Sequence, residues 1–249
     1  MGCAHHAEHT DAVAIVISSG RPAPPASNMG RMALLHRAEL RPSKIELIEA
    51  WAPDQPWFEG DAGAGFTSVA SFRFDDPEGE VGIETLLVRA GEGPVLQVPL
   101  TYRGSPLAGG DAWLIGLMQH SVLGERWTYD ATGDPVYLAA VATAALTGGN
   151  QAEQYYEVDG ARIHREPTAV VKCSGTPDAA ISAPPSIDSI STRHEHAGTL
   201  VDTGELRLGI ARVPGARVDA PDAASATLSG TWMGQTEPLV LVRVDVRED

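Results

Sequence analysis

The chain has 249 residues, of which 43% are hydrophobic and 20% charged, a composition typical of globular proteins. Its formal net charge of −15 argues against a surface that follows nucleic-acid phosphates, because such a surface needs clustered Lys and Arg. No apolar run approaches the roughly 20 residues of a membrane-spanning helix. The two cysteines, Cys3 and Cys173, are not spaced as a metal or redox motif. We therefore expect a cytoplasmic protein without nucleic-acid or membrane partners.

Residues 1–31 are predicted to be a disordered tail, because the stretch RPAPPASNMG and the Ala, Ser and His residues before it cannot form a core. The tail contains four side chains able to bind a metal, namely Cys3, His5, His6 and His9. Further fixed ligands are absent, so a tail that happens to contain them is the favoured interpretation.

The folded part is predicted to begin at residue 32. Alternation over 32–40 and again over 44–51 indicates two strands joined by a short turn at Pro42. A short helix over 43–51 is the alternative. Farther along, 66–75, 81–89 and 95–102 alternate between turn signals, which predicts an antiparallel meander.

Residues 114–120 and 126–130 are predicted to form a hairpin, because Gly116 and the run 127–129 favour strands. A helix starting at Asp111 competes with this interpretation. Residues 135–146 then form the best helix in the chain, with Asp134 as N-cap and Gly148 beyond its end. Its predicted packing face consists of Val136, Ala139, Ala140 and Ala144.

The second half is predicted to be rich in β-structure. A hairpin over 153–158 and 162–165 with a turn at 159–160 is followed by 168–173, which is expected to continue the same sheet. A long loop covers 178–190, and strands alternate with Gly turns over 191–246. The expected fold class is α+β, dominated by antiparallel sheet. The expected organisation is the tail 1–31, a domain over 32–150 and a β-rich extension over 151–249 packed on it.

Polar and aromatic side chains within the predicted strands are the candidate site residues: Tyr102, Arg103, Trp113, His120, Trp127 and Tyr129. Such a mixture is used by carbohydrate and protein-binding surfaces, but also by cores. Buried polar groups must be hydrogen-bonded, so an Arg103–carboxylate bridge or a buried network including Glu84 is expected.

Two further clusters could hold a metal ion, but each has a simpler interpretation. The carboxylates Asp75, Asp76, Glu78 and Glu80 are interpreted as a solvated hairpin tip rather than a cation site. His194 and His196 would share one face of a strand, yet a solvated loop pair is favoured. We therefore assign no metal, no cofactor and no catalytic residue.

Several stretches carry a resemblance to a known family: AELRPSKIELIEAW, QPWF, SFRFDDPEGEVGIETLLV, PVLQVPLTYRGSPLAGGDAWLIGLMQHSVLGERWTYDATGDPVY and ALTGG. Over roughly 32–149 the chain resembles the N-terminal cap domain of maltokinases and related aminosugar kinases. The resemblance implies a cystatin-like fold, in which a curved antiparallel sheet packs against a helix. In full-length kinases of this family the cap lies beside the nucleotide-binding lobe.

The sequence contains no H-x-D-x-x-x-x-N catalytic loop, no D-F-G-like triplet and no Gly-rich loop followed by a strand lysine. We therefore expect a non-catalytic accessory or regulatory protein. The resemblance implies a protein partner in α-glucan, maltose or trehalose metabolism, such as a sugar kinase. The alternative is a domain, or a partner subunit of a sugar kinase, that binds a sugar or sugar phosphate between its two halves.

Overall fold

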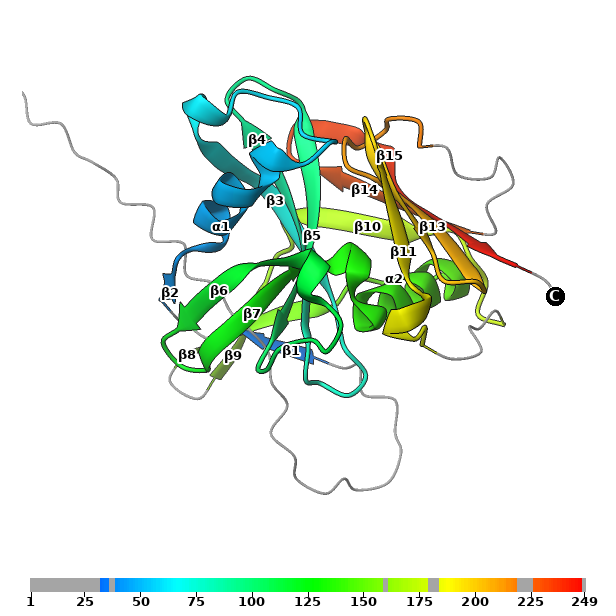
Figure 1. The fold of residues 1–249 in the computed structure, drawn as a ribbon. Helices are drawn as coiled ribbons and strands as arrows, with labels where there is room; N and C mark the ends of the chain where they lie inside the picture. The colour runs from blue at the N-terminus through cyan, green and yellow to red at the C-terminus, as the bar shows by residue number, and fades with distance from the viewer. Residues whose placement is uncertain (1–31, 36–38, 159–160, 179–183, 219–225, 248–249) are drawn as a thin grey trace, which may run out of the picture.

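The structure, a computed structural model, describes residues 32–35, 39–158, 161–178, 184–218 and 226–247. The predicted tail, with Cys3 and its histidines, and the predicted turn at 159–160 lie outside these residues. Within them, two six-stranded antiparallel sheets, a three-stranded sheet and two α-helices make up the fold (Figure 1). The expected α+β class with a curved antiparallel sheet and a second antiparallel region is confirmed. No helix among the described residues is both long enough and apolar enough to cross a bilayer.

The first sheet has the strand order β2-β6-β7-β5-β4-β3. Its strands are β2 (Leu40–Arg41), β3 (Phe66–Phe74), β4 (Gly82–Ala90), β5 (Val95–Arg103), β6 (Leu114–His120) and β7 (Gly124–Asp130). The predicted meander and hairpin are therefore confirmed. The competing helix at Asp111 is reduced to one 3-10 turn, Asp111–Trp113, before β6.

The first sheet is buried on both faces over β4 and β5. Leu86 and Val88 face one hydrophobic core, whereas Ile83 and Leu87 face another. This two-sided burial explains why apolar residues occupy successive positions of β4 instead of alternating with polar ones. The sheet is the middle layer of the molecule.

Helix α1 (Lys44–Trp51) covers the first of these faces and corrects the prediction of a second strand there. Ser43 accepts a hydrogen bond from the backbone N–H of Glu46, whose carboxylate accepts one from the N–H of Ser43. This capping box satisfies two N–H groups that a strand would leave to other partners. The helix then buries Leu47 and Ile48 against the sheet. The alternative helix over 43–51 was the right one.

Helix α2 (Pro135–Thr147) covers the other face, together with the second sheet. Asp134 caps its start by accepting from the N–H of Val136, and Gly148 ends it in a left-handed conformation, both as predicted. Its predicted small-residue face is confirmed in part: Ala144 belongs to the core, Val136 and Ala140 pack against it while partly buried, and Ala139 does not contribute. The helix packs on more than one side, so larger side chains are also buried: Tyr137, Leu138, Val141 and Leu146.

The second sheet has the order β10-β14-β15-β13-β12-β11. Its strands are β10 (Ala169–Cys173), β11 (Ser191–Glu195), β12 (Gly198–Asp202), β13 (Leu206–Ala211), β14 (Ala226–Trp232) and β15 (Gln235–Val246). The predicted strands within 191–246 are thus present. Together with α2 and strands β3 and β4, this sheet encloses one core, so the two sides of the predicted boundary at 150 share their hydrophobic interior. The domain division itself stays a prediction.

A three-stranded sheet completes the fold. In it β1 (Met32–Leu35) pairs in parallel with β8 (Glu153–Val158), which forms the predicted hairpin with β9 (Ala161–Arg165). The expectation that 168–173 continues this hairpin's sheet is wrong, because β10 leaves it and pairs with β14. Pro167, between β9 and β10, lacks a backbone N–H and marks the change of sheet.

Candidate functional site

The face of the first sheet that carries α2 and the second sheet is not covered along its whole width. Residues opposite each other in neighbouring strands share a face, and the register places Arg103, Trp127 and Leu117 side by side across β5, β7 and β6. Gln97 lies on the same face of β5, six residues earlier, where its side chain contacts the second sheet. The sheet thus extends from a covered end at Gln97 to an open end at β6.

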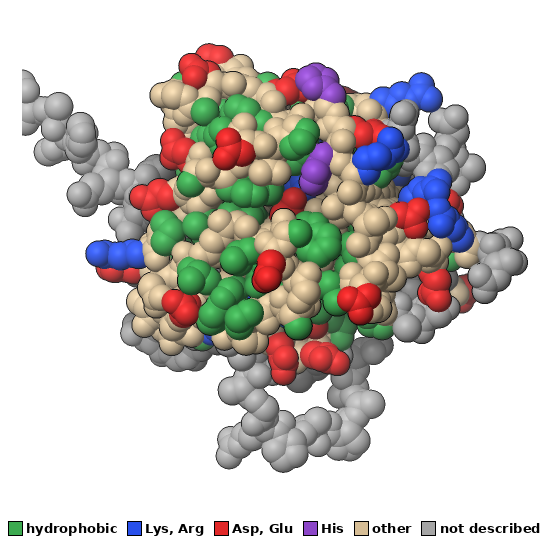
Figure 2. Space-filling view, viewed as in Figure 1, with side chains coloured by type: hydrophobic (Ala, Val, Ile, Leu, Met, Phe, Trp, Pro, Cys, Tyr) green, Lys and Arg blue, Asp and Glu red, His purple; other side chains and the backbone are tan. Residues whose placement is uncertain are grey.

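The open end exposes apolar side chains. Leu114 and Leu117 of β6 are 38% and 44% exposed, Val122 in the following turn is 55% exposed, and Trp127 is half-buried. Glu125 and Asp111 beside them are exposed. Figure 2 shows the apolar side chains gathered at the lower left, where β6 and β7 lie, with acidic side chains among them. Most Lys and Arg side chains in this view lie on the opposite side. We call these four apolar residues the open patch.

The six predicted site residues do not form one surface. Tyr102 and His120 point to the α1 side of the sheet and are buried, because alternation puts Tyr102 on the face opposite Arg103. The Nδ1 atom of His120 accepts the backbone N–H groups of Val122 and Leu123, both at 3.1 Å, and so holds the β6–β7 turn.

Trp113 and Tyr129 lie near the open patch but support the structure around it. The Tyr129 hydroxyl accepts the backbone N–H of Leu107 at 2.9 Å, which fixes the preceding loop. The Trp113 ring packs so closely on Gly133 that an added Cβ would lie 1.9 Å from it. Its Nε1 donates to Thr192 Oγ1 at 3.4 Å, linking the turn before β6 to the second sheet. Trp127 is therefore the predicted residue that belongs to the exposed patch.

Arg103 forms the carboxylate bridge that the sequence predicted. Its Nε and one terminal nitrogen bind the two oxygens of Asp134, both at 2.7 Å, and Thr101 donates to the same carboxylate at 2.7 Å. Burial by itself would lower the pKa of the Arg103 guanidinium, but Asp134 outweighs this effect and raises that pKa above its ordinary value. The pair joins the end of β5 to the start of α2.

A second ionic cluster lies on the opposite face, beneath α1. Lys44 of α1 binds the carboxylate of Glu84 on β4, which also accepts the Tyr102 hydroxyl at 3.0 Å. Burial lowers the pKa of Lys44 to about 8, although the charge of Glu84 opposes the change. Burial would raise the pKa of Glu84, but Lys44 and Arg73 hold it below its usual range. At neutral pH the cluster is therefore an ion pair, and it contains no group open to a substrate.

Arg212, a fully buried residue just after β13, joins the two sheets. Its guanidinium binds Asp130 of the first sheet at 2.5 Å and Thr199 of the second at 2.9 Å, and it lies 4.6 Å from the Trp57 ring centroid. Gln97 adds bonds to the carbonyls of Ala211 and Leu241. These contacts fix how the sheets are placed relative to each other.

The two candidate metal clusters have other local roles. Asp76 accepts the backbone N–H groups of Glu78, Glu80 and Val81, and so organises the turn between β3 and β4. Strand β11 ends at Glu195, so His196 lies in a turn and does not share a strand face with His194. His194 bonds to Thr199 at 3.0 Å, and His196 lies 3.4 Å from Glu59.

Comparison with known families identifies the first sheet. Residues 51–134 match the maltokinase N-terminal cap domain. The chain therefore contains a maltokinase N-terminal cap domain, which runs from the end of α1 through β7 to the N-cap of α2. This range is narrower at both ends than the resemblance over 32–149. No curated protein matches the chain.

The sequence analysis missed Leu114, Leu117 and Val122. Their residue types are the same as those of core residues, so the sequence alone does not show that they are exposed. The available signal was the alternation of side chains along β6. It places Leu117 and Gln119 on one face of the strand and Met118 and His120 on the other. Arg212 was also missed, since a single arginine in a strand-rich segment gives no sign of burial. Its role depends on Asp130, 82 positions away in the sequence.

Proposed function

We propose that this protein is a non-catalytic accessory or regulatory protein, which binds a protein partner through the open patch of its cap domain. The observation that carries the proposal is the sheet face itself: the covered end is sealed by α2 and the second sheet, and the remaining end exposes Leu114, Leu117 and Val122. Contiguous exposed apolar side chains with a polar rim are typical of protein interaction sites.

The match to maltokinase caps makes a sugar kinase, or another enzyme of α-glucan, maltose or trehalose metabolism, the first candidate partner. The acidic residues beside the patch, Glu125 and Asp111, favour a partner surface whose apolar centre is bordered by Arg or Lys. No catalytic step is assigned to the chain, because the buried charged groups described above form structural pairs with one another, as Lys44 does with Glu84 and Arg103 with Asp134.

The test compares binding by two matched variants. Leu117→Glu places a charge within the open patch, whereas Met233→Glu places one at the β14–β15 turn, where Met233 is 92% exposed. A purified maltokinase catalytic lobe and native lysate are each offered to the immobilised wild type and both variants. A partner retained by the wild type and Met233→Glu, but lost with Leu117→Glu, supports the proposal. A partner retained equally by all three contradicts the location, and catalysis of sugar phosphorylation by the purified chain contradicts the function.

A further inference from the structure

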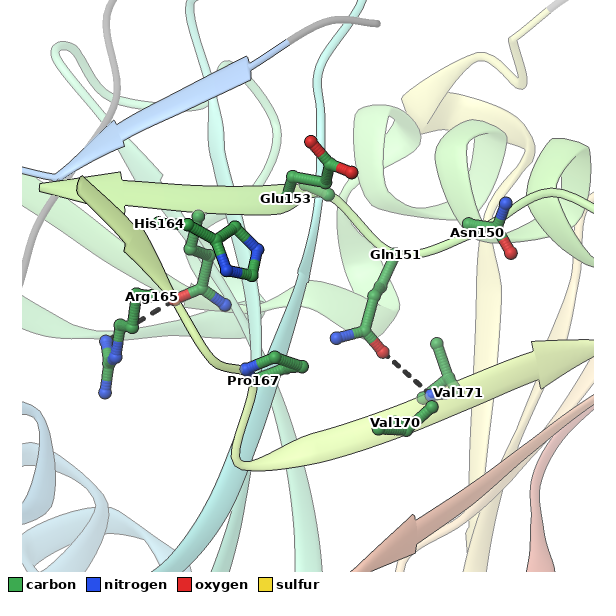
Figure 3. A pocket seen from close by; sticks show the side chains of 10 residues that line it. Asn150, Gln151, Glu153, His164, Arg165, Pro167, Val170 and Val171 are labelled. Atoms are coloured by element: carbon green, nitrogen blue, oxygen red, sulfur yellow. Dashed lines mark hydrogen bonds between the residues drawn. The ribbon is translucent and has the colours of Figure 1, made fainter. Parts of the chain in front are cut away.

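The polar side chains around the hollow between the β8–β9 hairpin and β10 do not converge on it. Figure 3 shows the Glu153 carboxylate and the Asn150 amide directed away from the hollow, which has a volume of about 200 Å³. Arg165 at its edge donates to Gln154 Oε1 at 3.4 Å. A buried charge that lacks a counter-charge is a stronger sign of a ligand, and among the described residues Arg126 of β7 is in that position.

Two other arginines of this fold show what a buried guanidinium requires. Arg103 binds the two oxygens of Asp134 through Nε and Nη2, both at 2.7 Å. Arg212 also uses Nη2, which lies 2.5 Å from the Asp130 carboxylate. Arg126 is only 7% exposed, yet it forms an ion pair with none of the described carboxylates.

Arg126 lies on the α1 side of the first sheet. It is opposite Met118 of β6, which belongs to the core beneath α1, whereas its neighbour Trp127 points to the other face with the open patch. On its other side the chain leaves β5 at Gly104, where an added Cβ would lie 2.8 Å from Nη1 of Arg126. Nη1 also donates to the Glu125 carbonyl at 3.3 Å. This edge of the guanidinium is therefore occupied.

The other edge of the guanidinium consists of Nε and Nη2, and we call it the free edge. Nε is buried, and neither nitrogen donates to any of the described residues. Burial lowers the pKa of Arg126, and no described carboxylate offsets this shift as Asp134 does for Arg103. The hydroxyl of Thr128, two residues farther along the same face, is also buried without a hydrogen-bond partner in this part of the chain.

We propose that the free edge of Arg126 binds the carboxylate of a small organic acid. Nε and Nη2 each donate to one carboxylate oxygen, in the arrangement that Arg103 and Asp134 already show within this chain. The side chain is 7% exposed, which restricts the ligand to a small molecule. A single cation matches one negative charge, whereas a phosphate dianion would add repulsion to a chain with a net charge of −15. The site lies on the face opposite the open patch, so either assignment can fail without the other.

The test is a titration of the ¹⁵N-labelled full chain with sodium acetate, in which sodium chloride keeps the ionic strength constant. The Nε–H signal of Arg126 and the backbone N–H signal of Gly104 report on the site. Acetate should shift both signals saturably, with a dissociation constant on the order of 10 mM for a ligand of so few atoms. Acetamide, which has the shape of acetate without its charge, should cause no saturable shift. Inorganic phosphate should bind more weakly than acetate.

Three variants locate the binding. Arg126→Met should abolish it, and Arg126→Lys, which keeps the charge but loses the fork of two donors, should weaken it on the order of tenfold. Arg89→Met removes an exposed arginine of β4 in the same sheet and should leave acetate binding unchanged. A dispersed amide spectrum verifies that each variant is folded.

The stability of Arg126→Met provides a readout that needs no ligand. Without acetate, its midpoint of urea denaturation should equal or exceed that of the wild type, because the variant removes a buried charge that no carboxylate compensates. A lowered midpoint would show that Arg126 is paired within the chain and would contradict the proposal.

Four titration results would overturn the proposal: no saturable shift with acetate, equal binding of acetamide, tighter binding of phosphate, or acetate binding that persists in Arg126→Met. The first result would mean that solvent water satisfies Nε. Undiminished acetate binding by Arg126→Lys would contradict the two-donor geometry.

Discussion

The second sheet and α2 cover one end of a face of the first sheet, whereas the β6–β7 end of the same face is exposed. At the covered end, Gln97 is hydrogen-bonded to the second sheet and Asp134 holds both Arg103 and the start of α2. At the open end, Leu114 and Leu117 have no comparable cover among the described residues and remain more than a third exposed. Polar side chains thus specify the contact between the first sheet and the second. Apolar side chains are exposed at the end where we propose that a partner protein binds.

Among the polar contacts, the largest effect is expected from breaking the covered end. Arg212→Met should lower the free energy of unfolding by about 3–5 kcal/mol, because it leaves the buried Asp130 carboxylate without its cation. Urea denaturation measures this. Arg207→Met is the matched control: Arg207 pairs with Asp202 at 3.6 Å, and both side chains are more than a third exposed or close to it, so the loss should cost less than about 1 kcal/mol. Equal losses would show that the contact between the sheets does not depend on Arg212.

A smaller effect at the covered end is expected from Gln97→Ala. The Gln97 amide donates to two buried carbonyls of the second sheet. Without it these carbonyls lose a hydrogen-bond donor, so the free energy of unfolding should fall by about 1–3 kcal/mol. Gln119→Ala removes the same side chain from the open end, where it bonds to Glu125 at the surface. That exchange should cost under about 0.5 kcal/mol by thermal or chemical denaturation. A reversed order would contradict the division into covered and open ends.

The opposite face of the sheet gives a pH-dependent comparison. Burial lowers the pKa of Lys44 to about 8 in the folded chain, against an ordinary lysine pKa of 10.5, so the unfolded chain binds more protons between these values. The free energy of unfolding should therefore rise from pH 8 to 9.5, by an amount on the order of 1 kcal/mol. Denaturation of wild type and Lys44→Met at both values isolates the effect from other titrating groups. An identical pH dependence in the two proteins would show that α1 does not exclude water from Lys44.

The smallest change in stability is expected at the open patch. Leu117→Glu should alter the free energy of unfolding by less than about 0.5 kcal/mol, because Leu117 is 44% exposed. Leu100→Glu, at a fully buried position of β5, should prevent folding or cost several kcal/mol. A large loss from Leu117→Glu would mean that this residue packs within the chain, and the patch would cease to be a candidate interface.

The sequence by itself determined elements whose signals are local. Helix α2 follows from Asp134, Pro135 and Gly148, and the hairpin β6–β7 from Gly116 and the aromatic run after it. Helix α1 was also encoded locally, by the Ser43–Glu46 capping box, but the alternation of Ile45 and Leu47 pointed to a strand. The Arg103–carboxylate bridge was predictable because a buried guanidinium requires a partner.

Tertiary structure decided what depends on residues far apart in the chain. Strand β10 follows the β8–β9 hairpin directly, yet it joins β14, some 60 positions later, because burial beside α2 favours that sheet. Arg212 finds Asp130 only when the two sheets meet. Local pattern fixes which residues form a strand and which side chains share a face. Only the packing of layers decides whether that face becomes core, as at Gln97, or remains open, as at Leu117.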